Sequence, residues 1–242
     1  MSKNVHMVLQ GKGGVGKSFV ASLLAQYFRS RDLNPLCIDT DPVNATFASY
    51  KAFDVQRLEI MKDNDVDQRA FDGLVEKIMG CDDDTTVIID NGAATFVPLC
   101  SYLVENGVID ILDAGNVTTL IHSILTGGQA FGDTTTGLGN LFKSFPNTPV
   151  CVWSNEFWGK PQLNGQPVET SRLFTDHEDQ IHSKITIPER RKDTFGHDME
   201  VMLKAKKTFA EAINDGSQNI MARQRLGMIW KNLSGQMAEA EL

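Results

Sequence analysis

The sequence predicts an α/β fold with a doubly wound, mainly parallel sheet and helices on both faces. Two observations support it. Short, continuously apolar runs of the kind found in buried strands alternate along the 242 residues with segments of helical periodicity. The first of these runs leads directly into a glycine-rich turn and a helix. Ligands of such sheets bind beyond the carboxyl ends of the strands, so the polar residues that follow each strand form the candidate site.

The elements are expected in a regular order along the chain. The predicted strands are residues 5–9, 35–38, 58–61, 86–89, 118–125, 149–153 and 184–187. The predicted helices are residues 17–31, 68–79, 96–104, a segment between the strands 118–125 and 149–153, and the chain after about residue 195. Because no linker, repeat or low-complexity tract interrupts this pattern, we expect one domain over residues 1–242. Its C-terminal helical segment is expected at about residues 195–238.

Spacing and chain-breaking residues set these boundaries. The helix at 17–31 carries apolar side chains at helical spacing, and the helix at 68–79 has an apolar face that includes Phe71 and Leu74. Pro188 stops the last strand, and Asn164-Gly165 predicts a tight turn. The sequence therefore indicates where strands end as well as where they run.

Composition excludes several classes of protein. Hydrophobic residues make up 41% of the chain, which excludes a disordered chain, and no apolar run reaches the roughly 18 residues of a membrane span. The four cysteines are scattered without a C-x-x-C pair, which favours buried thiols over metal or redox chemistry. The first residues lack the pattern of a signal peptide, so we expect a cytoplasmic protein.

Charge is distributed unevenly along the chain, whose net charge is −8. Residues 1–180 contain 13 Lys or Arg and 23 Asp or Glu, whereas residues 181–242 contain 10 and 8. A basic, DNA-binding patch is therefore expected only in the last quarter, where a solvated basic face is the alternative. The candidate side chains are Arg190, Arg191, Lys192, Lys204, Lys206 and Lys207.

A phosphate-binding loop is the strongest motif of the chain. The octapeptide from Gly11 to Ser18 fits G-x-x-x-x-G-K-[ST] between a predicted strand and a predicted helix. Its glycines let backbone N–H groups turn inward around a phosphate, and the helix N-terminus adds partial positive charge. Lys17 would bridge the β- and γ-phosphates of a nucleotide, and the Ser18 hydroxyl would bind Mg²⁺. The predicted nucleotide-binding residues here are Gly11, Lys12, Gly13, Gly14, Val15, Gly16, Lys17, Ser18 and Phe19.

Carboxylates follow two further predicted strands. Asp39 and Asp41 lie in an Asp-x-Asp-Pro sequence, which by itself is typical of a turn or helix cap. Beside a phosphate-binding loop, the same pair indicates groups that serve Mg²⁺ and an attacking water. Asp90 closes the apolar run Val87-Ile88-Ile89 in the manner of a Walker B strand, and it would hold a Mg²⁺-bound water.

The loop Lys12-Gly13-Gly14-Val15-Gly16-Lys17-Ser18 resembles the deviant Walker A loop of the ParA/MinD ATPases. This resemblance implies a P-loop ATPase in which Lys12 reaches across a homodimer to the partner's nucleotide, although a solvated loop lysine is the alternative. The resemblance extends to Asp39, Asp41, Pro42, Asn44, Ala45 and Thr46. It implies that Asp41 orients the hydrolytic water and that Asp39 sits near Mg²⁺. The chain departs from the family after Asp90, where Asn91-Gly92-Ala93-Ala94 stands in place of the usual prolines.

Two further positions concern the base of the nucleotide. The resemblance places Asn155 and Pro188, which follow the strands 149–153 and 184–187, beside the base. Capping of the strand end is the alternative role for Asn155. Because the sequence lacks an Asn/Thr-Lys-x-Asp guanine signature, ATP is favoured over GTP.

Several longer stretches resemble the TraL proteins of plasmid conjugative transfer systems. They include Met7–Gln10, Leu36–Phe47, Ile89–Ala93, Thr126–Ala130 and Met221–Leu226. The likeness extends from near residue 6 to near residue 235, and it implies a role in conjugation in the cytoplasm of a donor bacterium. It favours a slow, partner-regulated ATPase that switches as a homodimer and positions a transfer-apparatus or relaxosome protein. The alternative is a partition-type ATPase that binds DNA nonspecifically to segregate plasmids.

Large apolar side chains give two last expectations. The tryptophans Trp153, Trp158 and Trp230 are expected in the core or an interface rather than stacked on a base. In the last helix, one face can hold Met221, Gln224, Met228, Ile229 and Leu233. Acidic residues at the C-terminal end make membrane attachment unfavourable, so we expect this helix to pack on the protein.

Overall fold

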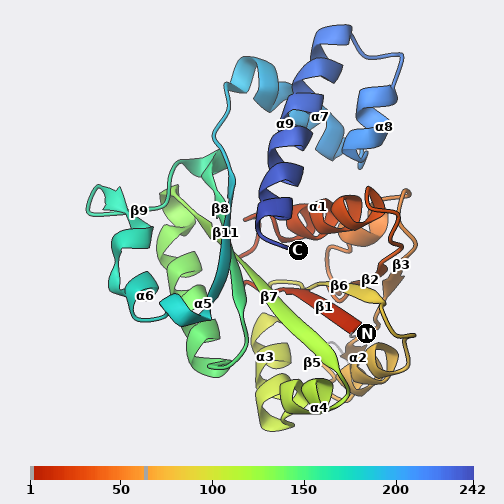
Figure 1. Ribbon diagram of the computed structural model, residues 1–242, viewed down its shortest axis with the longest axis vertical. Coiled ribbons are helices and arrows are strands. Elements are labelled where there is room, and N and C mark those ends of the chain that lie inside the picture. Colours follow the sequence, from red (N-terminus) through yellow and green to blue (C-terminus); the bar gives the residue numbers. More distant parts are fainter. Residues whose placement is uncertain (1–2, 63–64) are drawn as a thin grey trace.

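The computed structural model describes residues 3–62 and 65–242. Its main strands are β1 (Lys3–Val8), β2 (Leu36–Asp39), β3 (Val55–Arg57), β6 (Thr86–Asp90), β7 (Val117–Thr126), β8 (Val150–Asn155) and β11 (Ile181–Ile187). They form one seven-stranded sheet in the order β11-β8-β7-β1-β6-β2-β3, and each neighbouring pair is parallel (Figure 1). The chain adds strands β6, β2 and β3 on one side of β1 and strands β7, β8 and β11 on the other side. Doubly wound sheets bind ligands at such a switch point, where the direction of strand addition reverses.

Helices cover both faces of this sheet, as predicted (Figure 1). One face carries α1 (Lys17–Arg29), α7 (His197–Lys204), α8 (Phe209–Asn214) and α9 (Ile220–Glu239). The other carries α2 (Ala70–Met79), α3 (Phe96–Glu105), α4 (Val108–Ala114), α5 (Phe131–Ser144) and α6 (Arg172–Thr175). The predicted α/β fold class is therefore confirmed.

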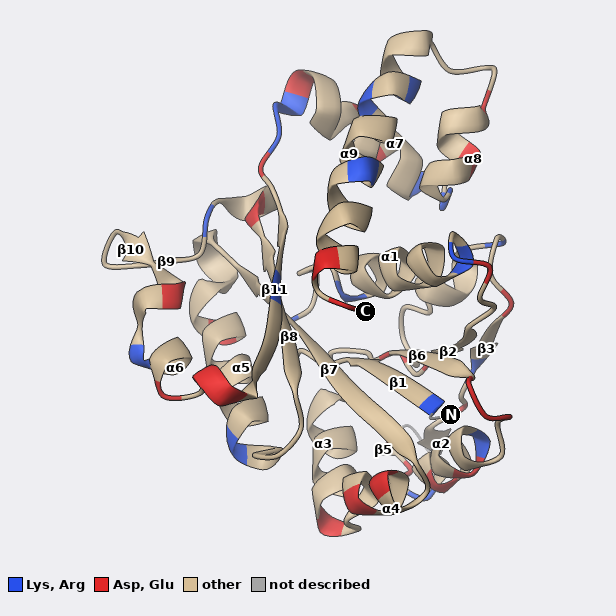
Figure 2. Ribbon diagram, viewed as in Figure 1, with Lys and Arg blue, Asp and Glu red and all other residues tan. Residues whose placement is uncertain are grey.

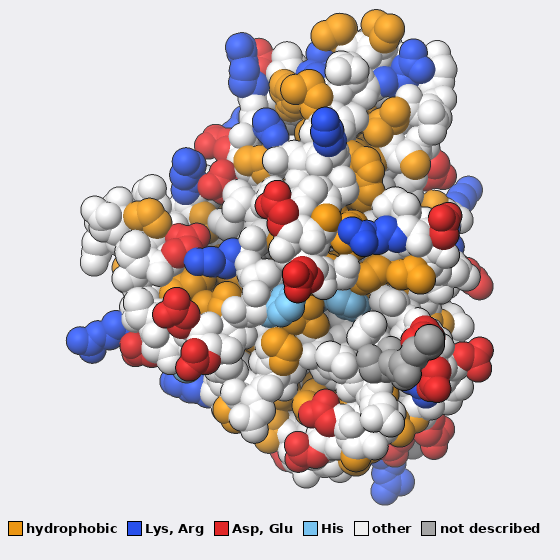
Figure 3. All heavy atoms as spheres, viewed as in Figure 1, with side chains coloured by type: hydrophobic (Ala, Val, Ile, Leu, Met, Phe, Trp, Pro, Cys, Tyr) orange, Lys and Arg blue, Asp and Glu red, His pale blue; other side chains and the backbone are white. Residues whose placement is uncertain are grey.

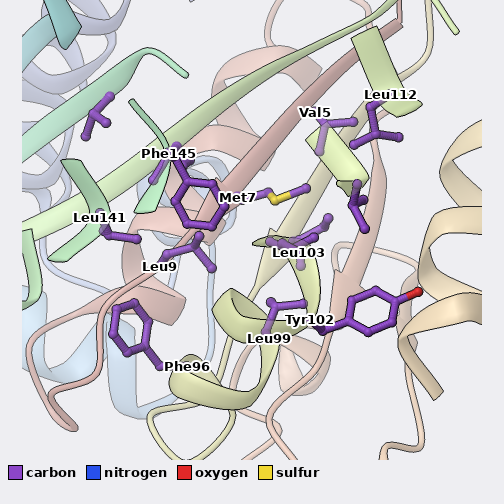
Figure 4. Close-up of a cluster of buried hydrophobic side chains, with 14 of the residues drawn as sticks. Val5, Met7, Leu9, Phe96, Leu99, Tyr102, Leu103, Leu112, Leu141 and Phe145 are labelled. Atoms are coloured by element: carbon purple, nitrogen blue, oxygen red, sulfur yellow. The ribbon is translucent and has the colours of Figure 1, made fainter. Parts of the chain in front are cut away.

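Alternation along β1 divides the core into two layers. Val5, Met7 and Leu9 point to one side, where they meet α3, α4 and α5 (Figure 4). Val8 points to the other side and belongs to the cluster under α1 and α9. All four side chains are at most 1% exposed, and burying each of them contributes roughly 1.5–3 kcal/mol. The strand that leads into the glycine-rich loop is thus anchored on both faces.

The last helix, α9, packs on the protein as expected. Its residues Leu226, Ile229 and Leu233 are buried against the rest of the domain. The side-chain amide of Gln236 forms two hydrogen bonds with the backbone of Thr186 in β11. The Thr186 N–H donates to Gln236 Oε1 at 2.7 Å, and Gln236 Nε2 donates to the Thr186 carbonyl at 2.9 Å. This pairing covers part of an edge strand that would otherwise expose unpaired backbone groups.

The prediction of which residues form the apolar face of that helix is wrong in part. Met221 and Met228 are more than half exposed, because the buried stripe follows Ala222, Leu226, Ile229, Leu233 and Met237 instead. Within residues 3–62 and 65–242, none of the helices combines the length and the apolar character needed to span a bilayer.

Three other differences from the sequence prediction are local. The strand expected at 58–61 is replaced by β3 and by a small hairpin of β4 (Met61–Lys62) and β5 (Asp65–Val66). The chain after residue 195 forms three helices rather than one, because Thr208 and Asn219 cap the starts of α8 and α9. The short helices α4 and α6 were not predicted. The turn at Asn164-Gly165 is confirmed, and it joins β9 (Gln162–Leu163) to β10 (Gln166–Pro167).

Candidate nucleotide-binding site

The glycine-rich loop connects the end of β1 to the start of α1. Gly14 and Gly16 have φ angles of 76° and 106°, a region of backbone conformation that glycine adopts without strain. Gly16 is the N-cap of α1, and Lys17 begins the helix. The Lys17 ammonium folds back over the loop and donates to the carbonyl of Lys12 at 2.8 Å. Backbone amides, a helix N-terminus and a lysine therefore converge at one place, which is the chemistry of a phosphate site.

Asp90 lies buried at the end of the adjacent strand β6. Its side chain is 1% exposed, and neither carboxylate oxygen has a hydrogen-bonding partner of good geometry among the described residues. Burial raises the pKa of Asp90 to about 7, with a further contribution from the charges of Asp39 and Asp41. The Ser18 hydroxyl and the Lys17 ammonium act in the opposite direction on this pKa. The Ser18 hydroxyl is thus near enough to lower the pKa of Asp90 as a hydrogen-bond donor would, but its geometry is not that of a hydrogen bond. A buried carboxylate in this situation fits a hydrated cation.

Asp39 and Asp41 hold the loop that follows β2. The two oxygens of Asp39 accept hydrogen bonds from the Asp41 and Ala48 amides, each at 2.9 Å. Asp41 Oδ1 accepts from the amides of Val43 and Asn44, also at 2.9 Å. Desolvation is the largest influence on Asp39 and raises its pKa. Both oxygens of Asp39 thus accept hydrogen bonds from the backbone. Among the described residues, only Oδ1 of Asp41 does so, and no backbone donor bonds to its Oδ2.

The segment after β6 is tied to the same loop by a buried network that sequence reasoning missed. Thr40 Oγ1 donates to Asn91 Oδ1 at 3.0 Å, and Thr95 Oγ1 donates to the same oxygen at 2.7 Å. Gly92 lies so close to Asp41 that a Cβ at this position would come within 2.7 Å of the Asp41 Cγ. Asn91 therefore links the loop after β2 to the segment after β6, and its position directly after Asp90 was the only signal for it in the sequence.

The start of the glycine-rich loop is fixed by β7 and α5. Gln10 is fully buried, and its Nε2 donates to the carbonyls of Ile124 at 3.0 Å and Thr134 at 3.1 Å. Lys12 Nζ forms an ion pair with Asp133 in α5 at 2.7 Å. The lysine expected to act across a dimer is thus paired within its own chain, through a residue that the sequence did not single out.

A cavity of about 500 Å³ extends from the loop toward α7 and α9. It is lined by Gly14, Gly16 and Phe19, and by both residues expected beside the base, Asn155 and Pro188. Asn155 Nδ2 donates to the Val15 carbonyl at 3.0 Å, and its Oδ1 accepts from the Phe157 amide at 3.2 Å. Asn155 thus lines the cavity next to the glycine-rich loop and caps the strand end, whereas its role beside a base stays a prediction.

In the described part of the chain, no three His, Cys, Asp or Glu side chains are grouped to hold a metal ion. Mg²⁺ does not need such a group, because it keeps several water ligands and takes others from nucleotide phosphates. The arrangement of Ser18 and Asp90 thus fits Mg²⁺ that arrives with a nucleotide.

Comparison with known proteins identifies the family. The sequence model of the CobQ/CobB/MinD/ParA nucleotide binding domain matches residues 6–237. Two Escherichia coli proteins, each described as protein TraL, are 44% and 45% identical over 237 residues, which is 98% of this chain and 98% of each relative. The chain belongs to the TraL proteins of this nucleotide-binding family. Among solved structures, the MinD cell division protein of Aquifex aeolicus is 15% identical, and the alignment covers 96% of this TraL-family chain and 97% of that chain at a TM-score of 0.47.

Membership agrees with the resemblance drawn from the glycine-rich loop and from the longer stretches of the sequence. Nucleotide binding is therefore the property that family membership assigns to this TraL-family chain. The geometry places the predicted phosphate, Mg²⁺ and base residues around one edge of the sheet, at the ends of β1, β2, β6, β8 and β11.

Proposed function

We propose that this protein binds and hydrolyses ATP with Mg²⁺ and that it acts as a nucleotide-controlled homodimer in conjugative plasmid transfer. The observation that carries the proposal is the buried, unpartnered carboxylate of Asp90 beside Ser18, at the end of the strand next to the glycine-rich loop. A structural carboxylate would have been given hydrogen-bond donors, because burying it alone is costly. A carboxylate in a site that receives Mg²⁺ together with a nucleotide does not need hydrogen-bond donors from the protein.

The roles proposed for the phosphate-binding residues follow from their positions. The loop amides of residues 11–18 and the Lys17 ammonium bind the phosphates, and Ser18 binds Mg²⁺. Asp90 would help to hold Mg²⁺ through a water, and Asp39 fixes the neighbouring loop. Mg²⁺ held in this way would offset the negative charge of the phosphates.

Hydrolysis needs a water in line with the γ-phosphate, and Asp41 is the group proposed to orient it. Its Oδ1 is held by two backbone amides, which fixes the direction of the carboxylate. Asp41 also contributes to the electrostatic environment of Lys17 and Asp90, so all three side chains share one site. Positioning of this kind lowers the barrier without covalent chemistry by the protein.

Homodimer formation is proposed to depend on Lys12. In the single chain this side chain pairs with Asp133, and the two side chains are 42% and 60% exposed. An ion pair exposed to this extent contributes only about 0–1 kcal/mol, so a stronger partner can replace it. The γ-phosphate bound by a second copy would be such a partner. ATP, and not ADP, would then favour the dimer.

A protein is favoured over DNA as the binding partner of the ATP-bound dimer. Lys and Arg residues occur along α7 and α9 and beside them (Figure 2), but several are paired with acidic residues. On the face drawn in Figure 3, acidic, apolar and uncharged side chains separate the basic ones. Nonspecific DNA binding relies on many unpaired cations along the phosphate backbone. We therefore propose a transfer-apparatus or relaxosome protein of the bacterial cytoplasm as the partner, with slow hydrolysis until that partner binds.

The proposal is tested by titrating the purified protein with ATP, with and without Mg²⁺, and by following phosphate release. We expect Mg²⁺-dependent binding and slow turnover. Binding that is indifferent to Mg²⁺ would contradict the role of Ser18 and Asp90. Strong, salt-dependent binding of the ATP form to DNA of arbitrary sequence would favour the partition-type function instead.

A further inference from the structure

Two large aromatic side chains are exposed at the cavity beside the glycine-rich loop. Phe157 and Trp158 are 54% and 57% exposed, and their rings pack edge to face with centroids 4.7 Å apart. Both belong to a 3₁₀ turn, Glu156–Trp158, that directly follows β8. They line the same cavity as Gly14, Gly16 and Phe19. Of the tryptophans expected in the core or an interface, Trp153 is fully buried in the core, whereas Trp158 lies outside it.

The turn that carries these rings is fixed to the site by several contacts. Asn155 accepts from the Phe157 amide and donates to the Val15 carbonyl, which ties the turn to the glycine-rich loop. Glu156 Oε2 accepts from the amide of Glu189 at 3.2 Å, which ties the turn to the segment after β11. The backbone of the turn that carries the two rings is thus fixed relative to the phosphate-binding loop by the buried Asn155, and relative to the segment after β11 by Glu156.

A glycine pair at the end of β7 makes room for this turn. A Cβ at Gly127 would clash with the carbonyl groups of Gly159 and Lys160, and a Cβ at Gly128 would lie 3.0 Å from the Trp158 carbonyl oxygen. The Gly127 amide donates to the Gly159 carbonyl at 3.1 Å, and Gly128 has a φ angle of 66°. The Thr126–Ala130 motif, which the nucleotide chemistry does not otherwise use, therefore serves to seat the aromatic turn.

We propose that Phe157 and Trp158 form a stacking wall for the base of the bound nucleotide, and that Gly127 and Gly128 exist to place this wall. The inference rests on the proposed nucleotide binding and adds base-binding residues to it. Because the loop fixes the phosphates at one end of the cavity, the nucleoside extends along the cavity walls, and these rings form one of them. Aromatic rings stack on the π-face of any base, so this wall strengthens binding of purine nucleotides without choosing between adenine and guanine.

Calorimetric titration in the presence of Mg²⁺ can separate base recognition from phosphate recognition. The ligands are ATP and inorganic tripolyphosphate, which carries the phosphates without a base. We expect Trp158→Ala to weaken ATP binding by about ten- to a hundredfold and to leave tripolyphosphate binding unchanged. Trp158→Phe retains a ring and should restore most of the ATP affinity. Leu163→Ala is the matched control, because Leu163 is exposed on the following hairpin and does not line the cavity.

Fluorescence gives an independent readout. ATP should change the emission of the wild-type protein, and Trp158→Phe should abolish this change while Trp230→Phe leaves it intact. Wild-type ATP affinity in Trp158→Ala would overturn the proposal, and so would equal losses for ATP and tripolyphosphate, because the turn would then only support the loop. Failure of the wild-type protein to bind either ligand would instead refute the proposed nucleotide function itself.

Discussion

At the phosphate end of the site, the buried carboxylate of Asp90 is left without a partner, whereas at the base end the buried amide of Asn155 is satisfied and two aromatic rings are exposed instead. Asp90 has two unpartnered oxygens, but Asn155 uses both ends of its amide within the protein. Phe157 and Trp158 are more than half exposed beside Asn155. In the proposed function, one end would recognise the phosphates through charge and the other would recognise the base through contact area. Mutations at the two ends should therefore fail in different ways.

The largest effect is expected for the phosphate end. Lys17→Ala should weaken Mg²⁺-ATP binding by about a hundredfold or more, because a charged hydrogen-bond donor in a buried site contributes on the order of 3 kcal/mol. Titration with a fluorescent ATP analogue measures the loss, and the exposed Lys143→Ala serves as the control. Near-normal affinity in Lys17→Ala would show that the phosphates bind elsewhere.

The second effect separates binding from turnover. Asp41→Ala should keep its ATP affinity but lower kcat by roughly a hundredfold, because orientation of the attacking water matters in the transition state far more than in the ground state. Single-turnover hydrolysis and equilibrium binding should be measured on the same preparation. If binding and turnover fall together, Asp41 belongs to the Mg²⁺ site or to the fold of the loop.

The unpartnered carboxylate predicts a dependence of stability on pH in the nucleotide-free, metal-free protein. The folded-state pKa of Asp90, about 7, lies above its ordinary value of 3.8, so the folded state binds more protons than the unfolded state between these values. Stability should therefore decrease as the pH rises from about 4 to about 7.

Asp90→Asn is the test of this pH dependence. It should flatten the corresponding part of the denaturation profile and stabilise the free protein at pH 8 by an amount on the order of a few kcal/mol. The same variant should lose the Mg²⁺ dependence of ATP binding. A profile identical to that of the wild type would mean that the Asp90 carboxylate has a partner in solution.

The smallest effect is expected for Asp133→Asn, which removes the partner of Lys12 within the chain. Since this ion pair is exposed, the change should shift the ATP-dependent monomer–dimer equilibrium by only a few-fold, toward the dimer. Lys12→Ala should shift it in the opposite direction. Sedimentation at several protein concentrations measures both shifts, and a shift of Asp133→Asn toward the monomer would be inconsistent with the proposed exchange of partners.

The two ends also differ in how well the sequence predicted them. The phosphate end follows from short-range patterns, because an apolar run that stops at Asp39 or Asp90 marks both a strand and its functional end. The central strands were predicted for the same reason. Residues 58–61 were predicted wrongly as one strand: Leu58 to Met61 is apolar enough to suggest it, but residues 58–60 lie between β3 and β4, and Met61 begins β4.

The base end depends on contacts between distant parts of the chain, which local patterns do not encode. The seat for Trp158 is formed by Gly127 and Gly128, some 30 residues earlier, and Asn155 contacts Val15 across 140 residues. The Thr40–Asn91–Thr95 network and the pairing of Lys12 with Asp133 were missed for the same reason. Their side chains are common surface types, so only the folded chain reveals what they do.

The central claim, a homodimer controlled by ATP, is tested most directly by light scattering of the wild-type protein with Mg²⁺ and either ATP or ADP. The account predicts the mass of two chains with ATP and of one chain with ADP or without nucleotide. Lys17→Ala should remain a single chain under all three conditions. A mass that is the same with ATP, with ADP and without nucleotide would contradict the account.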